Sequence, residues 1–196
     1  MRTDVGARLI GTAALLLMLT SCDLLFGASA TPEEAVKMQL NQLQISIEKS
    51  MGRSDTTQAA VLAIVDTSTI PTAGATEAEA EGASVAEALR RERIVRQELS
   101  NRLVSNRLIE VVQPTQTLID QARAEITASN SAALSLETVK QSKDSLKTEY
   151  IVNALIDRDG AEVNVVAQRT TDGVVIFQET LLDWEVVTGP ATEEAE

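Results

Sequence analysis

The apolar positions of this chain follow two spacings, and each spacing predicts a different kind of element. Apolar side chains three or four residues apart mark one face of a helix, whereas alternation or a short unbroken apolar run marks a strand. The first helix is expected over 32–51, because Thr31 and Pro32 form a typical helix start. Its apolar face consists of Val36, Leu40, Leu43 and Ile47.

A buried strand and a long helix are expected next. The unbroken apolar run Val61–Val65 is typical of a strand that is covered on both faces. Ser84 and Glu87 match a capping box, which predicts a helix from Ser84 to about Arg107. Its sheet-facing residues would be Ala88, Val95, Leu99 and Leu103. The residues expected to lie largely outward are Arg90, Arg91, Glu92, Arg93 and Arg96.

The second half of the chain predicts short strands and helices that end in a meander. The expected elements are a strand at 108–112, helices at 114–126 and 135–147, and strands at 150–157, 163–167 and 174–182. Asp159–Gly160 and Asp172–Gly173 separate the last three strands, and such pairs are typical of hairpin turns. The order predicts a single α/β domain whose mixed β-sheet is covered by helices mainly on one face, with a C-terminal antiparallel three-stranded meander.

The amino-terminal segment has the pattern of a secretory signal. Arg2 and Arg8 precede an uncharged run over 9–19. This run is too short to span a bilayer comfortably, since a span needs about 20 residues. Leu19, Thr20 and Ser21 then precede Cys22 and resemble the lipobox of bacterial lipoproteins. The resemblance implies that residues 1–21 are removed and that Cys22 receives a covalent lipid. The alternatives are an uncleaved anchor or a secreted protein with an incidental cysteine.

The mature chain then divides into three parts. Residues 22–32 are expected to form a lipidated tether, 33–187 the folded domain and 188–196 a disordered tail. Within the domain, 69–83 is rich in Ala, Gly, Thr and Glu and predicts a flexible acidic loop. The loop's alternating glutamates could suggest a cation site, but solvated side chains are the simpler interpretation.

Composition excludes several kinds of chemistry. The chain has no histidine and one cysteine among 196 residues, so histidine-dependent nucleophiles, histidine metal ligands and intramolecular disulfides are excluded. The net charge of -12 argues against nucleic-acid binding. We therefore expect no enzyme activity, no metal and no cofactor besides the lipid on Cys22. Asp66, at the end of the first strand, is interpreted as a strand-end cap.

One basic cluster departs from the acidic composition. Arg90, Arg91, Arg93 and Arg96 follow each other along the long helix. A solvated helix face with local Glu–Arg pairs is the simpler interpretation. The functional alternative is a docking patch for an acidic partner.

The folded part resembles a family of bacterial envelope lipoproteins that includes the flagellar protein FlgO, the curli secretion protein CsgG and the penicillin-binding-protein activator LpoB. The resemblance lies in the strand 61–66, the helix segment 98–104, the strand 108–112 and the hairpin segments 149–153 and 163–175. It implies non-enzymatic work through contacts with an envelope protein or with further copies. A secretion pore would need extra amphipathic strands, and a synthase activator a longer tether. The lengths of the spare segment and of the tether favour an accessory protein of the flagellar outer-membrane type. The inner membrane is the alternative location, because Asp23 directly follows Cys22.

Three other functions stay open at this point. The domain could activate or regulate peptidoglycan synthesis. It could bind a small ligand or glycan at the sheet edge near Asp66, which would require a concave pocket with convergent polar groups. An enzyme that uses carboxylates alone would require two close acids with displaced pKa values.

Overall fold

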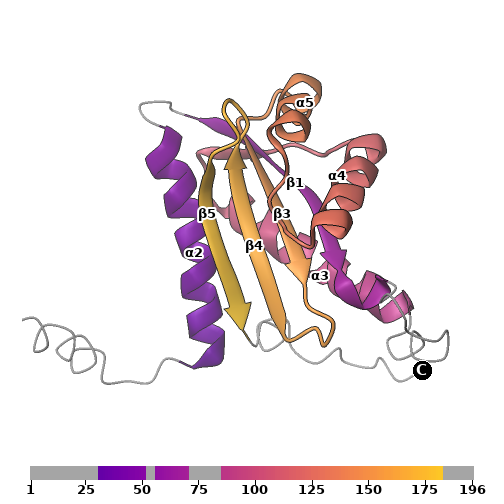
Figure 1. The fold of residues 1–196 in the computed structure, drawn as a ribbon. Coiled ribbons are helices and arrows are strands. Elements are labelled where there is room, and N and C mark those ends of the chain that lie inside the picture. Colours follow the sequence, from indigo (N-terminus) through magenta and orange to yellow (C-terminus); the bar gives the residue numbers. More distant parts are fainter. Residues whose placement is uncertain (1–30, 52–55, 71–84, 183–196) are drawn as a thin grey trace, which may run out of the picture. The chain divides into compact units, whose positions relative to one another are not determined.

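The computed structural model describes residues 31–51, 56–70 and 85–182, and these form an ordered series of helices and strands (Figure 1). The elements are α2 (Pro32–Met51), β1 (Thr57–Asp66), the 3-10 turn η1 (Thr67–Thr69), α3 (Val85–Ser105), β2 (Ile109–Val111), α4 (Gln116–Ser129), α5 (Leu136–Leu146), β3 (Tyr150–Ile156), β4 (Glu162–Arg169) and β5 (Val175–Leu182). This order confirms the α/β class and the sequence of elements expected from the apolar pattern.

Several expectations fall outside the described residues. They are the signal peptide 1–21, the lipidation site Cys22, the tether up to residue 30, most of the acidic loop at 69–83, the cap residue Ser84 and the tail 188–196. Only the start of the expected loop is described, and there Thr69 completes η1. Among the helices that are described, each is too short or too polar to cross a membrane.

The strands form one mixed five-stranded sheet with the order β2-β1-β3-β4-β5. β1 lies parallel to both of its neighbours, whereas β3, β4 and β5 pair antiparallel and form the expected meander. β2 pairs only with Thr57–Ala59, the first residues of the ten-residue strand β1. Among the residues that the structure describes, no strand lies beside the rest of β1 on that side.

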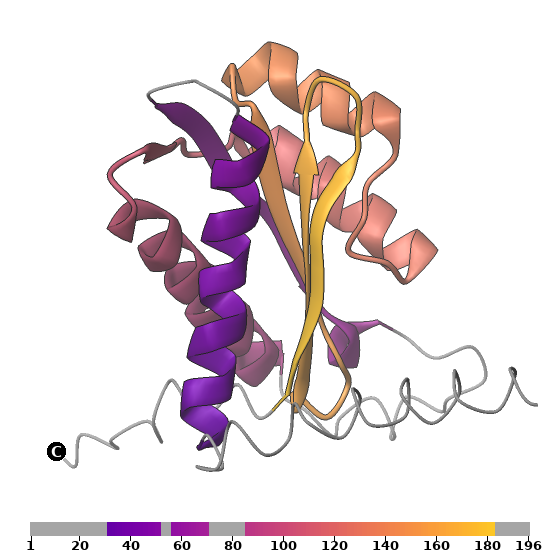
Figure 2. The ribbon, with the colours of Figure 1, turned by 90° about the vertical axis from the view of Figure 1, so that its left-hand side faces the viewer.

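Helices cover both faces of the sheet, which differs from the expectation of helices mainly on one face (Figure 2). α2 and α3 pack on one face, against alternate residues of β1, β3, β4 and β5. α4 and α5 pack on the other face, against the intervening residues of β1 and against Ile151 of β3. The reason is that β1 and β3 are apolar on both sides, so each face must be shielded from water.

Two buried amide side chains, those of Asn153 and Gln168, form hydrogen bonds to the backbone of neighbouring segments. The register of β1 and β3 shifts between Val61 and Ile64, and Asn153 Oδ1 accepts a hydrogen bond of 3.2 Å from the N–H of Ala63 within that bulge. Gln168 of β4 accepts a bond of 2.8 Å from the N–H of Leu134 and donates one of 2.9 Å to its carbonyl. This pair of bonds holds the connection between α4 and α5 against the sheet.

Candidate functional site

Asp66 is fully buried at the carboxyl end of β1. Its Oδ1 accepts hydrogen bonds from the backbone N–H of Ser68 at 2.9 Å and from the Ser68 hydroxyl at 2.6 Å, so the carboxylate caps η1. Its Oδ2 accepts a bond of 2.8 Å from Nε of Arg91. The prediction of a strand-end cap is confirmed, and the ion pair to α3 is an addition that the sequence did not reveal.

Arg91 and Glu92 do not lie outward, so that expectation was wrong. Their exposed fractions are 8% and 7%. Helical spacing identified the apolar face of α3 correctly, but it could not show that α3 runs beside a stretch of β1 that lacks a neighbouring strand. Residues next to the apolar face are buried there because they reach polar groups of β1.

Along this edge of β1, side chains of α3 and α4 form hydrogen bonds to backbone groups that a neighbouring strand would otherwise pair. Arg96 of α3 donates to the carbonyl of Val61 at 2.8 Å, and Arg123 of α4 donates to the carbonyl of Ile64 at 2.8 Å. The N–H of Asp66 donates to Glu92 Oε1 at 3.1 Å. Backbone groups left unpaired away from water would be costly, so these three contacts stabilise the buried half of the strand that β2 does not reach.

Glu92 also joins the two arginines electrostatically. Its Oε1 accepts a bond of 2.9 Å from Nη2 of Arg123. Burial lowers the pKa of Arg96, against the charge of Glu92, and the nearby Arg123 charge lowers it further. The hydrogen bond to Glu92 raises the pKa of Arg123, against the effect of burial. Both guanidinium groups stay charged, because the pKa of arginine lies far above neutral pH. The cluster is a structural ion network.

The turn between β3 and β4 packs against Arg91, the arginine that pairs with Asp66. Gly160 has a φ of +76°, and a Cβ added there would lie 3.0 Å from Cδ of Arg91. The turn closes through bonds from the N–H of Asp157 to the Glu162 carbonyl and from the N–H of Glu162 to Asp157 Oδ1, each of 2.9 Å. Asp66 thus fixes η1 directly and fixes this turn through Arg91.

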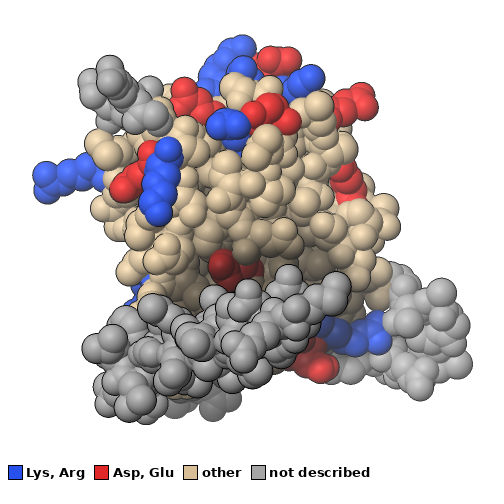
Figure 3. All heavy atoms as spheres, turned by 60° about the vertical axis from the view of Figure 1, so that its left-hand side comes forward, with Lys and Arg blue, Asp and Glu red and all other residues tan. Residues whose placement is uncertain are grey.

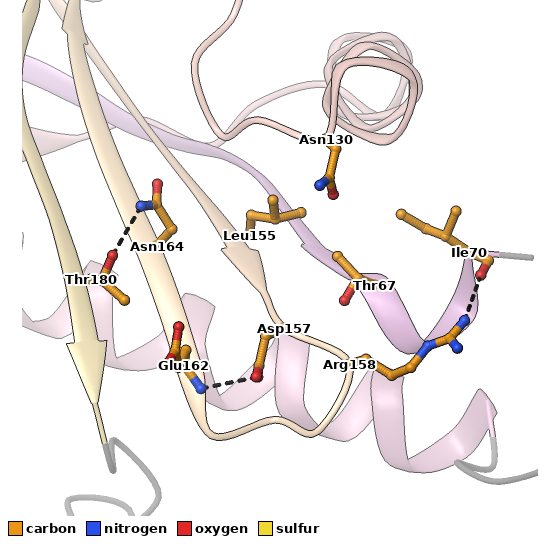
Figure 4. Close-up of a pocket in the computed structure, with 9 residues that line it drawn as sticks. All are labelled: Thr67, Ile70, Asn130, Leu155, Asp157, Arg158, Glu162, Asn164 and Thr180. Carbon is orange, nitrogen blue, oxygen red and sulfur yellow. Dashed lines mark hydrogen bonds between the residues drawn. The ribbon is translucent and has the colours of Figure 1, made fainter. Parts of the chain in front are cut away.

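A cleft of about 570 Å³ opens between η1, the end of α4 and the β3–β4–β5 strands (Figure 4). Its lining residues are Thr67, Ile70, Asn130, Leu155, Asp157, Arg158, Glu162, Asn164 and Thr180. The cleft begins one residue after Asp66. The structure therefore has, near this position, a concave pocket with several polar side chains in its lining, as the ligand-binding alternative required.

The four arginines of the predicted docking patch have different environments. Arg91 and Arg96 belong to the buried contacts just described. Arg90 pairs with Glu87 at 3.1 Å on the helix surface, and Arg93 is exposed. Docking of an acidic partner stays a prediction, and Arg90 and Arg93 are the members that a partner could reach.

The charges are unevenly distributed over the surface on the side of α2 and β5 (Figure 3). Charged side chains gather at the end where α5 and the β4–β5 turn lie, and a wide uncharged area extends below them. The exposed residues of β5 include the uncharged Gln178 and Thr180 and, between them, the charged Glu179. Charge depletion is typical of the central part of a protein–protein interface.

Sequence reasoning missed Arg123 and Asn153, since neither has a local motif. In the described part of the chain, no group of three or more Cys, Asp or Glu side chains could hold a metal ion.

No protein-family model and no curated protein matches the chain. Three solved structures do. The LpoB C-terminal domain from Escherichia coli is 15% identical with a TM-score of 0.40, over 72% of this chain and 92% of that chain. The corresponding Salmonella enterica domain is 11% identical with a TM-score of 0.36, over 70% and 91%. The NMR structure of E. coli LpoB is 16% identical with a TM-score of 0.34, over 71% of this chain and 64% of that chain.

Proposed function

We propose that this chain is a lipoprotein anchored to an envelope membrane through Cys22, and that its α/β domain acts by contact with a protein partner. The observation that carries the proposal is the lipobox pattern Leu19–Thr20–Ser21–Cys22. The folded part supports it, because Asp66, Arg91 and Glu92 hold turns and a strand edge in place. These buried charges thus have structural roles.

The finer part of the proposal concerns the partner. The two candidates are peptidoglycan synthesis and flagellar assembly; both come from the resemblance in the sequence, where the segment lengths favour the second, and the experiment below decides between them. A tether of residues 22–32 extends at most about 35 Å. The partner must therefore come close to the lipid surface, with the outer membrane as the first location and the inner membrane as the alternative because of Asp23.

Crosslinking from the uncharged area of the surface tests the partner. A photo-reactive amino acid at Gln178, an exposed position of β5, should give one discrete crosslinked species in cells that carry the full tethered chain. The same substitution at Asp144, exposed on the charged end of α5, is the matched control and should give little. Mass spectrometry of the species identifies the partner. A flagellar protein would favour the second candidate, and absence of any discrete species would contradict the proposal.

Lipidation is tested separately with Cys22→Ser. Without the sulfur no thioether-linked lipid can form, so the protein should move almost completely from the membrane fraction to the soluble envelope fraction and should incorporate no labelled fatty acid. Ser21→Ala keeps a small residue before the cleavage site and should behave like the unmodified chain. Unchanged membrane association of Cys22→Ser would contradict the anchor.

A further inference from the structure

The cleft beside Asp66 is a built site, because segments distant in sequence are fixed around it by buried contacts. Thr67 belongs to η1, which the Asp66 carboxylate caps. Asp157 and Glu162 flank the β3–β4 turn, which packs on Arg91. Asn130 ends α4 in a left-handed conformation with a φ of +51°. A volume of about 570 Å³ lies within the usual range of small-molecule sites, about 300–1,000 Å³.

The lining combines hydrogen-bonding side chains with a larger apolar surface. Amide and hydroxyl side chains come from Thr67, Asn130, Asn164 and Thr180. The apolar contribution comes from Leu155 and Ile70. Figure 4 shows the Asn130 amide extending from α4 towards Leu155, opposite the pair formed by Asn164 and Thr180. Such a lining suits a ligand with several amide groups and one aliphatic side chain.

The charges are separated within the cleft. Asp157 and Glu162 face each other across the base of the turn, where Asp157 Oδ1 accepts the bond from the Glu162 N–H. Arg158 points away from them, and its Nη2 donates to the carbonyl of Ile70 at 3.4 Å. The end between β3 and β4 is therefore acidic and suits a positively charged group.

None of the nine lining residues is aromatic. Sugar rings in protein sites usually stack on aromatic side chains, and the described part of the lining offers hydrogen-bonding and aliphatic groups in their place. We therefore consider a ligand of the amide-bearing class.

We propose that the cleft binds a short peptide that carries a primary amine. The ammonium group lies beside Asp157 and Glu162. The peptide amides bond to the side chains of Asn130 and Asn164, and an aliphatic side chain packs on Leu155. The cleft shares Thr180 of β5 with the surface that carries the crosslinking position, so the two proposals are distinguished by their readouts: peptide titration for the cleft and crosslinking for the protein partner.

The test uses the full-length chain in detergent micelles and a blocked tripeptide, N-acetyl-Ala-Lys-Leu-amide. Titration followed by amide NMR should give saturable shifts at Asn130, Asn164 and Thr180. The same peptide with an acetylated lysine lacks the positive charge and should bind at least threefold more weakly. Glu162→Gln removes an exposed carboxylate and should weaken the lysine peptide about threefold to fivefold.

Two further variants make the result specific to the cleft. Thr180→Val removes a hydroxyl without disturbing strand propensity and should also weaken binding. Asp144→Asn removes an exposed carboxylate on α5 and should leave binding unchanged. Equal binding of both peptides, shifts centred outside the cleft, or no saturable shift at millimolar peptide would overturn the proposal.

Discussion

Arg91→Ala is expected to lower the free energy of unfolding by about 3–5 kcal/mol, the largest effect of any single charge removal in this domain. The substitution leaves the Asp66 carboxylate at 0% exposure without its guanidinium, and a buried charge without a partner is strongly destabilising. It also removes the side chain on which Gly160 packs, so the β3–β4 turn loses its support.

Urea unfolding followed by circular dichroism measures this loss as a lower midpoint at an unchanged slope. Arg90→Ala is the matched control on the same helix. Its pair with Glu87 is exposed by 38% and 42%, so the expected change is within about 1 kcal/mol. The double variant Asp66→Ala with Arg91→Ala should recover part of the loss, because no unpaired charge remains. Equal effects of Arg90→Ala and Arg91→Ala would refute the role of the buried pair.

Glu92→Ala is expected to cost about 2–3 kcal/mol, somewhat less than the loss at Arg91. The substitution removes the carboxylate that bonds to Arg123 and offsets the charge of Arg96, leaving the weaker influence of Asp120 on Arg123, and it deprives the Asp66 N–H of its acceptor. The loss is smaller because the Arg123 side chain is 31% exposed, so water can solvate part of its charge.

Amide hydrogen exchange distinguishes this local role from general destabilisation. The Asp66 N–H should exchange faster in Glu92→Ala than the amides at the centre of β3 do, because its own hydrogen bond is lost. Glu98→Ala, which breaks a partly buried pair with Arg102 on the same helix, is the control and should leave the Asp66 amide unchanged. Uniform acceleration across the sheet would contradict a specific edge contact.

The predicted losses of stability also affect the cleft. The same Asp66–Arg91 pair that stabilises the domain also places η1 and the β3–β4 turn, which carry Thr67, Asp157 and Glu162. A variant that lacks this pair and still folds should therefore also have a distorted cleft. Stability and a binding site are linked here through a single buried carboxylate.

The sequence by itself determined the order of elements and much of the core. The apolar run Val61–Val65, the spacing of Leu40, Leu43 and Ile47, and the Asp–Gly turns all have local causes, namely burial, helical periodicity and backbone geometry. The same locality allowed Asp66 to be recognised as a cap, since its acceptor role involves Ser68 only two residues away.

Only the tertiary structure decided which charges are buried and where the cleft lies. Arg91, Glu92 and Arg123 look like surface residues in their own helices. Arg91 and Glu92 are buried and Arg123 is partly buried, because β2 stops after pairing with Ala59. The free edge of β1 is then bonded by side chains from two different helices. The cleft likewise brings together residues from Thr67 to Thr180. Strand length and helix placement are properties of the whole packed chain, so no local pattern could reveal these contacts.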